Sequence, residues 1–152
     1  MRMLVQRVKH ASVTIDGRLH SRTGAGLLVF VGVGLEDTSE DAEYLAGKLV
    51  RLRIFDDEAG VMNLDVRQTG GEVLVVSQFT LQASTRKGNR PSYVRAAPEA
   101  VSRPLYEGFA ARVAELLGRP VATGVFGADM QVELLNDGPV TILLDTDEIM
   151  KK

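Results

Sequence analysis

The segment at positions 26–33 constrains the fold most, because its side chains are apolar or absent without interruption, from Gly26 to Val33. A strand with one face in water alternates apolar and polar residues, whereas a strand buried on both faces does not. The run has the length of a strand and is far shorter than the roughly 20 apolar residues of a membrane-spanning helix. The sequence therefore predicts a central strand that is buried on both faces.

Further strands are predicted around this one. A second buried strand at 72–81 has a polar end, and the alternating segment 11–15 is followed by Asp16-Gly17, a tight-turn signal. The turn residues Asn136-Asp137-Gly138-Pro139 separate two further apolar segments and predict a plain hairpin. The remaining predicted strands lie at 3–8, 130–135 and 140–144.

Two principal helices are predicted. The first begins within the hydroxyl and acidic residues of 37–41, which suit a helix start, and ends near Arg53. The second begins at about Glu99 or Ser102 and ends at Leu117; Pro104 favours the later start, because proline is tolerated in a first turn. The apolar faces are Ala42, Leu45, Ala46, Leu49 and Leu52 on the first helix, and Leu105, Phe109, Val113, Leu116 and Leu117 on the second.

These elements predict a fold class of α/β, strictly α+β, with a mainly antiparallel or mixed sheet, because the strands come in runs rather than alternating with helices. The 152 residues suit a single domain over 1–152. Charges at Arg2 and Arg7 interrupt the first residues, so no apolar signal core is present, and we expect a cytoplasmic protein without a membrane segment.

Composition excludes several kinds of site. The chain has no cysteine, which rules out disulfides, a thiolate nucleophile and cysteine-bearing metal sites. The only histidines, His10 and His20, make a poor metal site, so no metal is expected. A net charge of −2 argues against bulk polyanion binding and leaves room only for a local basic patch. Sparse aromatic residues argue against a base-stacking platform.

Three segments are candidates for chemistry. The polar end of the second buried strand, Ser77-Gln78-Phe79-Thr80, would place Ser77 and Phe79 on one side and Gln78 and Thr80 on the other, or it is an ordinary strand end. The segment 136–141 is the second. The third, a basic loop that could hold phosphates or be merely solvated, contains Arg86, Lys87 and Arg90 and continues to Arg95.

Ser77-Gln78-Phe79-Thr80-Leu81 and Asn136-Asp137-Gly138-Pro139-Val140-Thr141, in this order, resemble the paired signature motifs of the D-aminoacyl-tRNA deacylases. The likeness extends over nearly the whole chain and includes Gln6-Arg7-Val8, Met62-Asn63-Leu64 and Arg90-Pro91-Ser92. The position of Asp137 often carries serine in this family. The first motif is intact and differs from the related branch that has P-Q-A-T-L.

The resemblance implies a small barrel-like sheet, a homodimer with active sites at its interface, and hydrolysis of D-aminoacyl-tRNA without a cofactor. Ser77, Gln78, Phe79 and Thr80 would form the catalytic pocket for the terminal adenosine. A cis Gly138-Pro139 bond would reach into the partner subunit's pocket and reject L-amino acids, together with Arg7 and Asn136. Arg86, Lys87, Arg90 and Arg95 would contact tRNA.

A steric filter of this kind would not reject glycine, so hydrolysis of glycyl-tRNA is a further expectation. Two alternatives from other classes stay open at this stage. One is a general small esterase that uses Ser77 or Thr80 with one of the histidines, and the other is a non-catalytic RNA-binding module.

Overall fold

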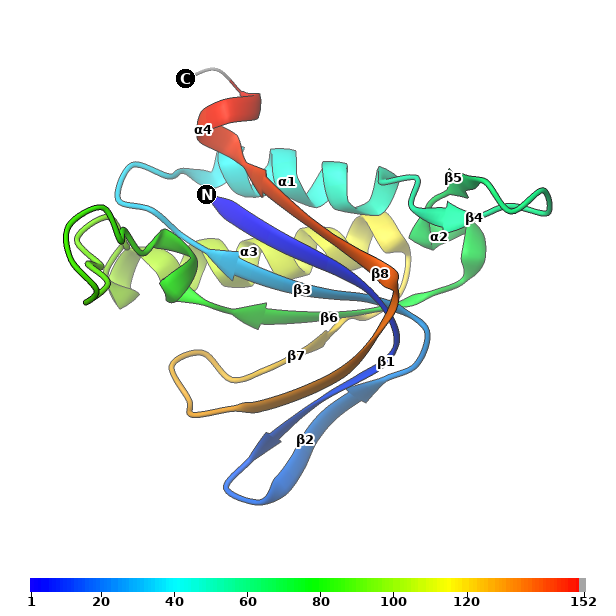
Figure 1. The fold of residues 1–152 in the computed structure, drawn as a ribbon, viewed down its shortest axis with the longest axis horizontal. Coiled ribbons are helices and arrows are strands. Elements are labelled where there is room, and N and C mark those ends of the chain that lie inside the picture. Colours follow the sequence, from blue (N-terminus) through cyan, green and yellow to red (C-terminus); the bar gives the residue numbers. More distant parts are fainter. Residues whose placement is uncertain (151–152) are drawn as a thin grey trace.

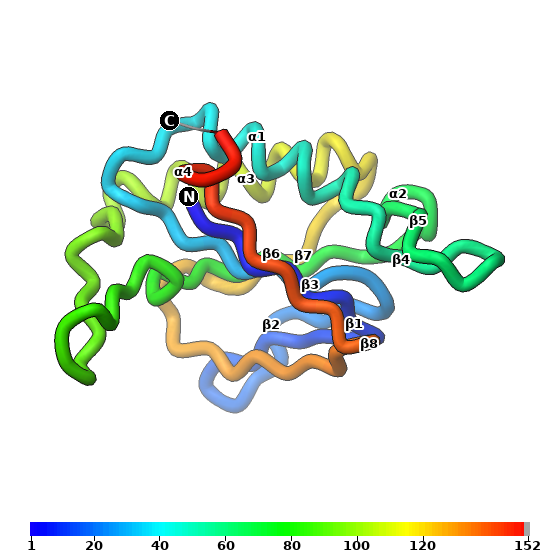
Figure 2. The backbone as a smooth tube through the Cα atoms, turned by 45° about the horizontal axis from the view of Figure 1, so that its top comes forward, coloured from blue at the N-terminus to red at the C-terminus, as the bar shows by residue number. Residues whose placement is uncertain are grey.

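The computed structural model describes residues 1–150, which form one domain with a curved, nearly closed sheet and two long helices against one of its faces (Figures 1 and 2). The strands are β1 (Arg2–Ile15), β2 (Arg18–Thr23), β3 (Gly26–Gly32), β4 (Phe55–Asp56), β5 (Met62–Leu64), β6 (Glu72–Ser77), β7 (Ala122–Thr123) and β8 (Gln131–Asp145). The helices are α1 (Ser39–Arg51), α2 (Val66–Thr69), α3 (Glu99–Leu117) and α4 (Thr146–Ile149), with a 3-10 turn η1 (Phe79–Gln82).

The main sheet is mixed, as predicted. Its order is β2-β1-β3-β6-β7, and β8 pairs with β1. The β3–β6 and β6–β7 pairs are parallel, and the pairs made by β1 are antiparallel. The hydroxyl of Ser21 on β2 donates to the carbonyl of Thr123 on β7 at 3.0 Å, which joins the two ends of the sheet and gives it a barrel-like form.

The predicted central strand is confirmed as β3, which lies between β1 and β6. Alternate side chains of this strand enter two different cores. Leu27 packs in the core between the sheet and the helices, whereas Leu28 packs in the core inside the barrel, and both are fully buried. This division explains why the segment is apolar on both faces.

The structure corrects the predictions for the first and last strands. β1 is one unbroken strand rather than two. Residues 136–139 are not a hairpin turn, because both halves of β8 pair with β1 in the same antiparallel ladder. Gln6 pairs with Thr141 and Val8 with Asn136, so Arg7 alone faces residues 137–140. We call residues 136–141 the β8 bulge, since the extra residues protrude from a continuous strand.

The first helix begins as predicted. The side chain of Thr38 accepts from the backbone of Glu40, and the Asp41 carboxylate accepts from the backbone N–H of Thr38, which completes a capping box. All the residues predicted for its apolar face are buried except Leu52, which is partly buried.

The later start predicted for the second helix is wrong, because α3 begins at Glu99 and contains Pro104. Proline at this position removes the hydrogen bond to the carbonyl of Ala100. Ala100 is exposed, so water can satisfy that carbonyl near the helix start. Three residues of the predicted apolar face, Phe109, Val113 and Leu117, are buried. Within residues 1–150, no helix is long and apolar enough to cross a membrane.

Candidate functional site

The strand β6 ends at Ser77, not at Leu81 as predicted, and the chain then turns into η1. The N–H of Gln78 still donates to Val31 on β3 at 2.8 Å, and its carbonyl then accepts from Leu81 at 3.2 Å. A Cβ atom at Gly32 would lie 2.8 Å from the Gln78 carbonyl oxygen, so glycine is required for η1 to lie against β3. The predicted alternation of Ser77 and Phe79 against Gln78 and Thr80 is therefore wrong.

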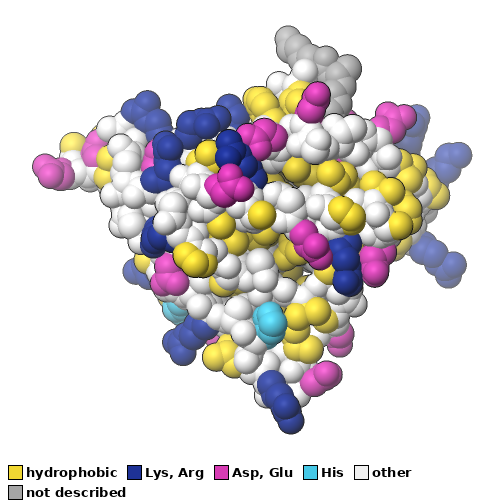
Figure 3. All heavy atoms as spheres, turned by 180° about the vertical axis from the view of Figure 1, so that it is seen from behind, with side chains coloured by type: hydrophobic (Ala, Val, Ile, Leu, Met, Phe, Trp, Pro, Cys, Tyr) yellow, Lys and Arg dark blue, Asp and Glu magenta, His cyan; other side chains and the backbone are white. Residues whose placement is uncertain are grey.

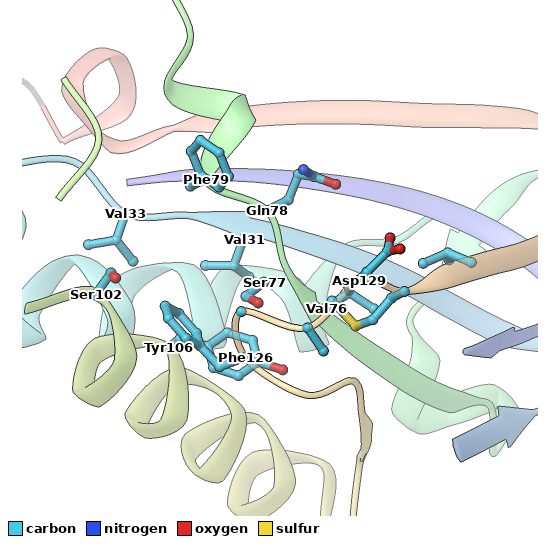
Figure 4. Close-up of a pocket in the computed structure, with 14 residues that line it drawn as sticks. Val31, Val33, Val76, Ser77, Gln78, Phe79, Ser102, Tyr106, Phe126 and Asp129 are labelled. Carbon is cyan, nitrogen blue, oxygen red and sulfur yellow. The ribbon is translucent and has the colours of Figure 1, made fainter. Parts of the chain in front are cut away.

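A pocket of about 300 Å³ lies where β3 and β6 end, between η1 and α3 (Figure 4). Ser77, Gln78 and Phe79 line it, whereas Thr80 does not. The other lining residues come from β3 and the residue after it, from β6 and α3, and from the end of the segment before β8 and the start of β8, namely Val31, Val33, Val76, Ser102, Tyr106, Phe126, Gly127, Ala128, Asp129, Met130 and Val132.

Tyr106 and Phe126 form an aromatic wall of this pocket, with ring centroids 5.9 Å apart. The Tyr106 hydroxyl donates to the Val75 carbonyl at 3.0 Å. Burial, with the nearby Glu107 carboxylate, raises the pKa of Tyr106 to about 12, so the residue stays a neutral hydrogen-bond donor. The guanidinium of Arg103 lies 5.0 Å from the centre of the Phe126 ring.

The sequence analysis missed this aromatic wall, because Tyr106 and Phe126 are twenty residues apart and belong to no motif. The chain has only five phenylalanines and three tyrosines, and three of these eight rings line the pocket. Phe79, at the pocket rim, also packs edge-on against Tyr93 at 5.0 Å. A low aromatic content over the whole chain therefore does not exclude a local group of rings, and Phe79, Tyr106 and Phe126 form one at this pocket.

The polar groups of the first motif are connected locally. The side-chain N–H of Gln78 donates to the Thr80 hydroxyl at 2.6 Å, and an amide cannot act as a general base. Across residues 1–150, the backbone N–H groups of Phe79 and Thr80, the first two of η1, donate to no protein acceptor. The site thus offers free donors beside the pocket but no base for Thr80.

The histidines do not join this site. His10 lies within β1, where it pairs with Leu135, and His20 lines a separate hollow with Arg103 and Glu107. On the rear face of the molecule the two histidine side chains form separate patches (Figure 3). Among the described residues, neither histidine has a hydrogen bond to Ser77 or Thr80, so no Ser-His pair forms within the chain.

The β8 bulge is held by polar contacts. Arg7, whose side chain is 11% exposed, donates from Nε to the Asp137 carbonyl at 2.9 Å and from Nη1 to the Ile54 carbonyl at 2.7 Å. The Asp137 carboxylate lies 3.7 Å from Arg7 Nε, and that of Asp56 lies 3.8 Å from Arg7 Nη1. The Gly138-Pro139 peptide bond is cis, and both residues are exposed.

The two motifs lie at opposite ends of β3. The bulge is level with residues 26–28, because Gln6 and Val8 pair with Leu28 and Gly26, whereas the pocket is level with Val31 and Val33. Five residues of strand correspond to roughly 15 Å. No bulge residue lines the pocket, so one described chain does not bring the two motifs together.

Three of the four predicted tRNA-contacting residues share one exposed loop after η1, which projects from the body of the molecule (Figure 2). We call Arg86, Lys87 and Arg90 the basic loop. Its base is closed by paired backbone hydrogen bonds of 2.8 Å between Ser84 and Ser92. The structure separates Arg95 from this group, since its guanidinium lies 3.6 Å from the Asp147 carboxylate.

Comparison with known proteins identifies the family of this chain. The model of the D-Tyr-tRNA(Tyr) deacylase family matches residues 4–145. The chain belongs to this family. The D-aminoacyl-tRNA deacylases of Parabacteroides distasonis and Bacteroides thetaiotaomicron are 61% and 59% identical to it, each over 96% of this chain and 97% of the relative. The family predicted from the two motifs is confirmed, and so is the enzyme class, a hydrolase.

Two solved structures resemble this deacylase-family chain. One, named c-Myc DNA Unwinding Element Binding Protein, has a TM-score of 0.91 and 42% identity, and the match covers 95% of this chain and 98% of that one. The other, described as a probable eukaryotic D-amino acid tRNA deacylase, has a TM-score of 0.81 over 94% and 97% of the two chains. At 18% identity it shows the shared fold, and the predicted barrel-like α/β class is confirmed.

Proposed function

We propose that this protein hydrolyses the ester between a D-amino acid and the terminal adenosine of tRNA. The observation that carries the proposal is the pocket in which Ser77, Gln78 and Phe79 meet an aromatic wall. Aromatic rings stack on nucleobases, so the partly exposed ring of Phe126, which packs against the buried Tyr106, provides a surface for the adenine. The ester end of the adenosine then lies beside the polar residues of η1.

The chemistry needs little beyond positioning. The neighbouring ribose hydroxyl activates an aminoacyl ester, so a site that holds water and stabilises the oxyanion is sufficient. The unpaired N–H groups of Phe79 and Thr80 are the proposed oxyanion donors. Ser77 and Gln78 orient the substrate, and the ribose 2′-hydroxyl helps to activate the attacking water.

A direct attack by the Thr80 hydroxyl is the alternative mechanism, and it requires a base. The one side chain bonded to this hydroxyl in the described residues is the Gln78 amide, which favours the backbone mechanism. The Thr80→Ala variant distinguishes the two. Near-full turnover supports backbone donors, whereas a loss of several orders of magnitude with intact tRNA binding supports the nucleophile.

A homodimer is proposed because one chain keeps its two motifs roughly 15 Å apart along β3. The exposed bulge of one subunit can reach the pocket of the other. A mixing experiment tests this arrangement. A pocket variant (Phe126→Ala) and a bulge variant (Gly138→Ala) are each purified, then mixed and allowed to exchange subunits.

If the active site contains residues of both subunits, mixed dimers regain one intact site. At substrate concentrations well below KM, the ratio of D-tyrosyl- to L-tyrosyl-tRNA hydrolysis then rises above the value given by the mean rates of the two separate variants. If each chain acts alone, mixing restores nothing. Sedimentation of the separate variants confirms that each still forms a dimer and that the comparison is valid.

The chiral filter is proposed to be the bulge, which would clash with an L side chain in the pocket of the partner subunit. Glycine has no side chain to clash, so glycyl-tRNA is expected to be hydrolysed as well. The decisive assay compares D-tyrosyl-, L-tyrosyl- and glycyl-tRNA with a chelator present. Turnover of D-tyrosyl- and glycyl-tRNA supports the proposal; cleavage of small esters without RNA supports an esterase; binding without turnover supports an RNA-binding module.

A further inference from the structure

We propose that Asn136 is a positioning residue, which fixes the shape of the β8 bulge and thereby sets chiral discrimination, without contacting the substrate. The proposal rests on the function proposed above. A carboxamide has one acceptor oxygen and two N–H donors. The oxygen of Asn136 accepts from the Val140 N–H at 2.8 Å, and its nitrogen donates to the Val140 carbonyl and the Thr141 hydroxyl, both at 3.1 Å.

These bonds close the base of the bulge. The Asn136 amide pairs with both the N–H and the carbonyl of Val140, as a neighbouring strand would, in a place where β1 provides only Arg7 opposite residues 137–140. Thr141, at the far end, also accepts from the Gln6 side chain at 3.3 Å. The amide therefore fixes the distance between the two ends of the loop.

The inside of the loop leaves no free space. A Cβ atom at Gly138 would lie 2.9 Å from Val140 Cγ2 and 3.2 Å from the Arg7 guanidinium. Arg7 also donates to the Asp137 carbonyl of the same loop. With hydrogen bonds at Asp137, Val140 and Thr141, the loop holds Gly138 and Pro139 in a defined position.

Rigidity at this position matters more for rejection than for catalysis. A wall excludes an L side chain only if it does not yield, since a small retreat of the loop relieves the clash. Without the Asn136 amide, Val140 loses both partners and the loop can open. We therefore expect the variants to gain activity on the L substrate, which a general loss of folding does not produce.

The test measures kcat/KM for D-tyrosyl- and L-tyrosyl-tRNA with three variants. Asn136→Ala removes all three bonds, and Asn136→Asp keeps only the acceptor for the Val140 N–H. Thr141→Val is the matched control, because it removes a single Asn136 bond and leaves the Val140 pair intact. For Asn136→Ala we expect L-tyrosyl-tRNA hydrolysis to rise about tenfold, which corresponds to the loss of one or two hydrogen bonds, with a smaller rise for Thr141→Val.

An unchanged or lower rate on L-tyrosyl-tRNA in a folded, dimeric Asn136→Ala protein overturns the proposal, and a fall on the D substrate alone would instead make Asn136 a substrate contact. Wild-type inactivity on both substrates would overturn the proposed function and with it the role of Asn136 in chiral discrimination. The structural part, that Asn136 fixes the bulge, is then tested by amide hydrogen exchange: the Val140 N–H is expected to lose its protection in Asn136→Ala but not in Thr141→Val, and unchanged protection in Asn136→Ala would overturn it.

Discussion

The pocket and the β8 bulge differ in what holds them. Residues from the ends of β3 and β6, from η1 and α3, and from the start of β8 and the segment before it make up the pocket, and many of them are apolar. The bulge packs against the core through Val140 and is otherwise held by hydrogen bonds to Arg7 and within itself. Stability is therefore shared among many residues in the pocket and concentrated in a few residues at the bulge.

This difference suits two tasks. Under the proposed function, the packed, aromatic pocket would bind the adenosine that all substrates share, whereas the hydrogen-bonded loop would present fixed backbone atoms to the aminoacyl group that varies between them. The comparison predicts that a single substitution at the bulge has a large effect, because few residues hold it. A single substitution at the pocket is predicted to have a smaller effect that depends on the size of the side chain, because many residues share its packing.

The largest effect is expected for Arg7→Met. The guanidinium makes two hydrogen bonds to backbone carbonyls from a mostly buried position, and charged hydrogen bonds contribute about 1.5–3 kcal/mol each. We expect the free energy of unfolding in urea to fall by about 3 kcal/mol. Lys9→Met, at an exposed position on the same strand, is the control. A loss below about 1 kcal/mol would mean that the bulge does not depend on Arg7 in this way.

The next effect concerns Tyr106 and pH. Its pKa is raised to about 12 in the folded protein, against about 10 in the unfolded chain, so its stabilisation is complete below pH 10 and is lost as pH rises from 10 to 12. The full loss is about 2–3 kcal/mol. Urea midpoints measured from pH 9 upward should fall more steeply in wild type than in Tyr106→Phe.

The exposed Tyr93, replaced by phenylalanine, is the control for this measurement. Parallel pH dependences in wild type and Tyr106→Phe would mean that burial at the pocket wall does not govern this titration.

For Phe126→Ala we expect KM for D-tyrosyl-tRNA to rise roughly tenfold with kcat little changed, because stacking a base on an aromatic ring contributes about 1–3 kcal/mol. The KM of Phe126→Leu should lie between those of the wild type and Phe126→Ala, because leucine keeps part of the apolar contact area. A fall in kcat with constant KM would assign the ring to the arrangement of η1 rather than to binding.

The smallest effect is expected for the basic loop, which we propose contacts the acceptor-stem backbone. Each neutralised phosphate contact among Arg86, Lys87 and Arg90 should reduce the slope of log affinity against log salt by about 0.7–0.9. Arg112→Gln, on α3 between Glu43 and Glu115, provides the control. An unchanged slope in the loop variants would put the tRNA path on another surface.

Local patterns predicted much of the fold. The uninterrupted apolar run identified β3, the capping residues identified the start of α1, and Asp16-Gly17 identified the β1–β2 turn, where both residues have positive φ. In each case the deciding interactions lie within a few residues or depend only on burial.

The predictions that were wrong or missing depend on contacts between residues far apart in the sequence. Asn136-Asp137-Gly138-Pro139 suits a hairpin and a bulge equally well, and the choice is made by β1, more than a hundred residues away, which pairs with both flanks. Tyr106 and Phe126 belong to no motif that was given a role, and only the packing of α3 against the sheet brings them together. The two site motifs were found, but their separation within one chain depends on strand register.

β1 pairs with β8 along its length, with Arg2 beside Asp145. The pairing of β1 can therefore be completed only after β8 has been synthesised. Until then one edge of β1 is open, and the β1–β8 contacts are among the most distant in sequence. Chains with such long-range pairing fold slowly and expose unpaired strand edges on the way. We therefore expect the polypeptide to be more prone to aggregation before β8 has paired with β1.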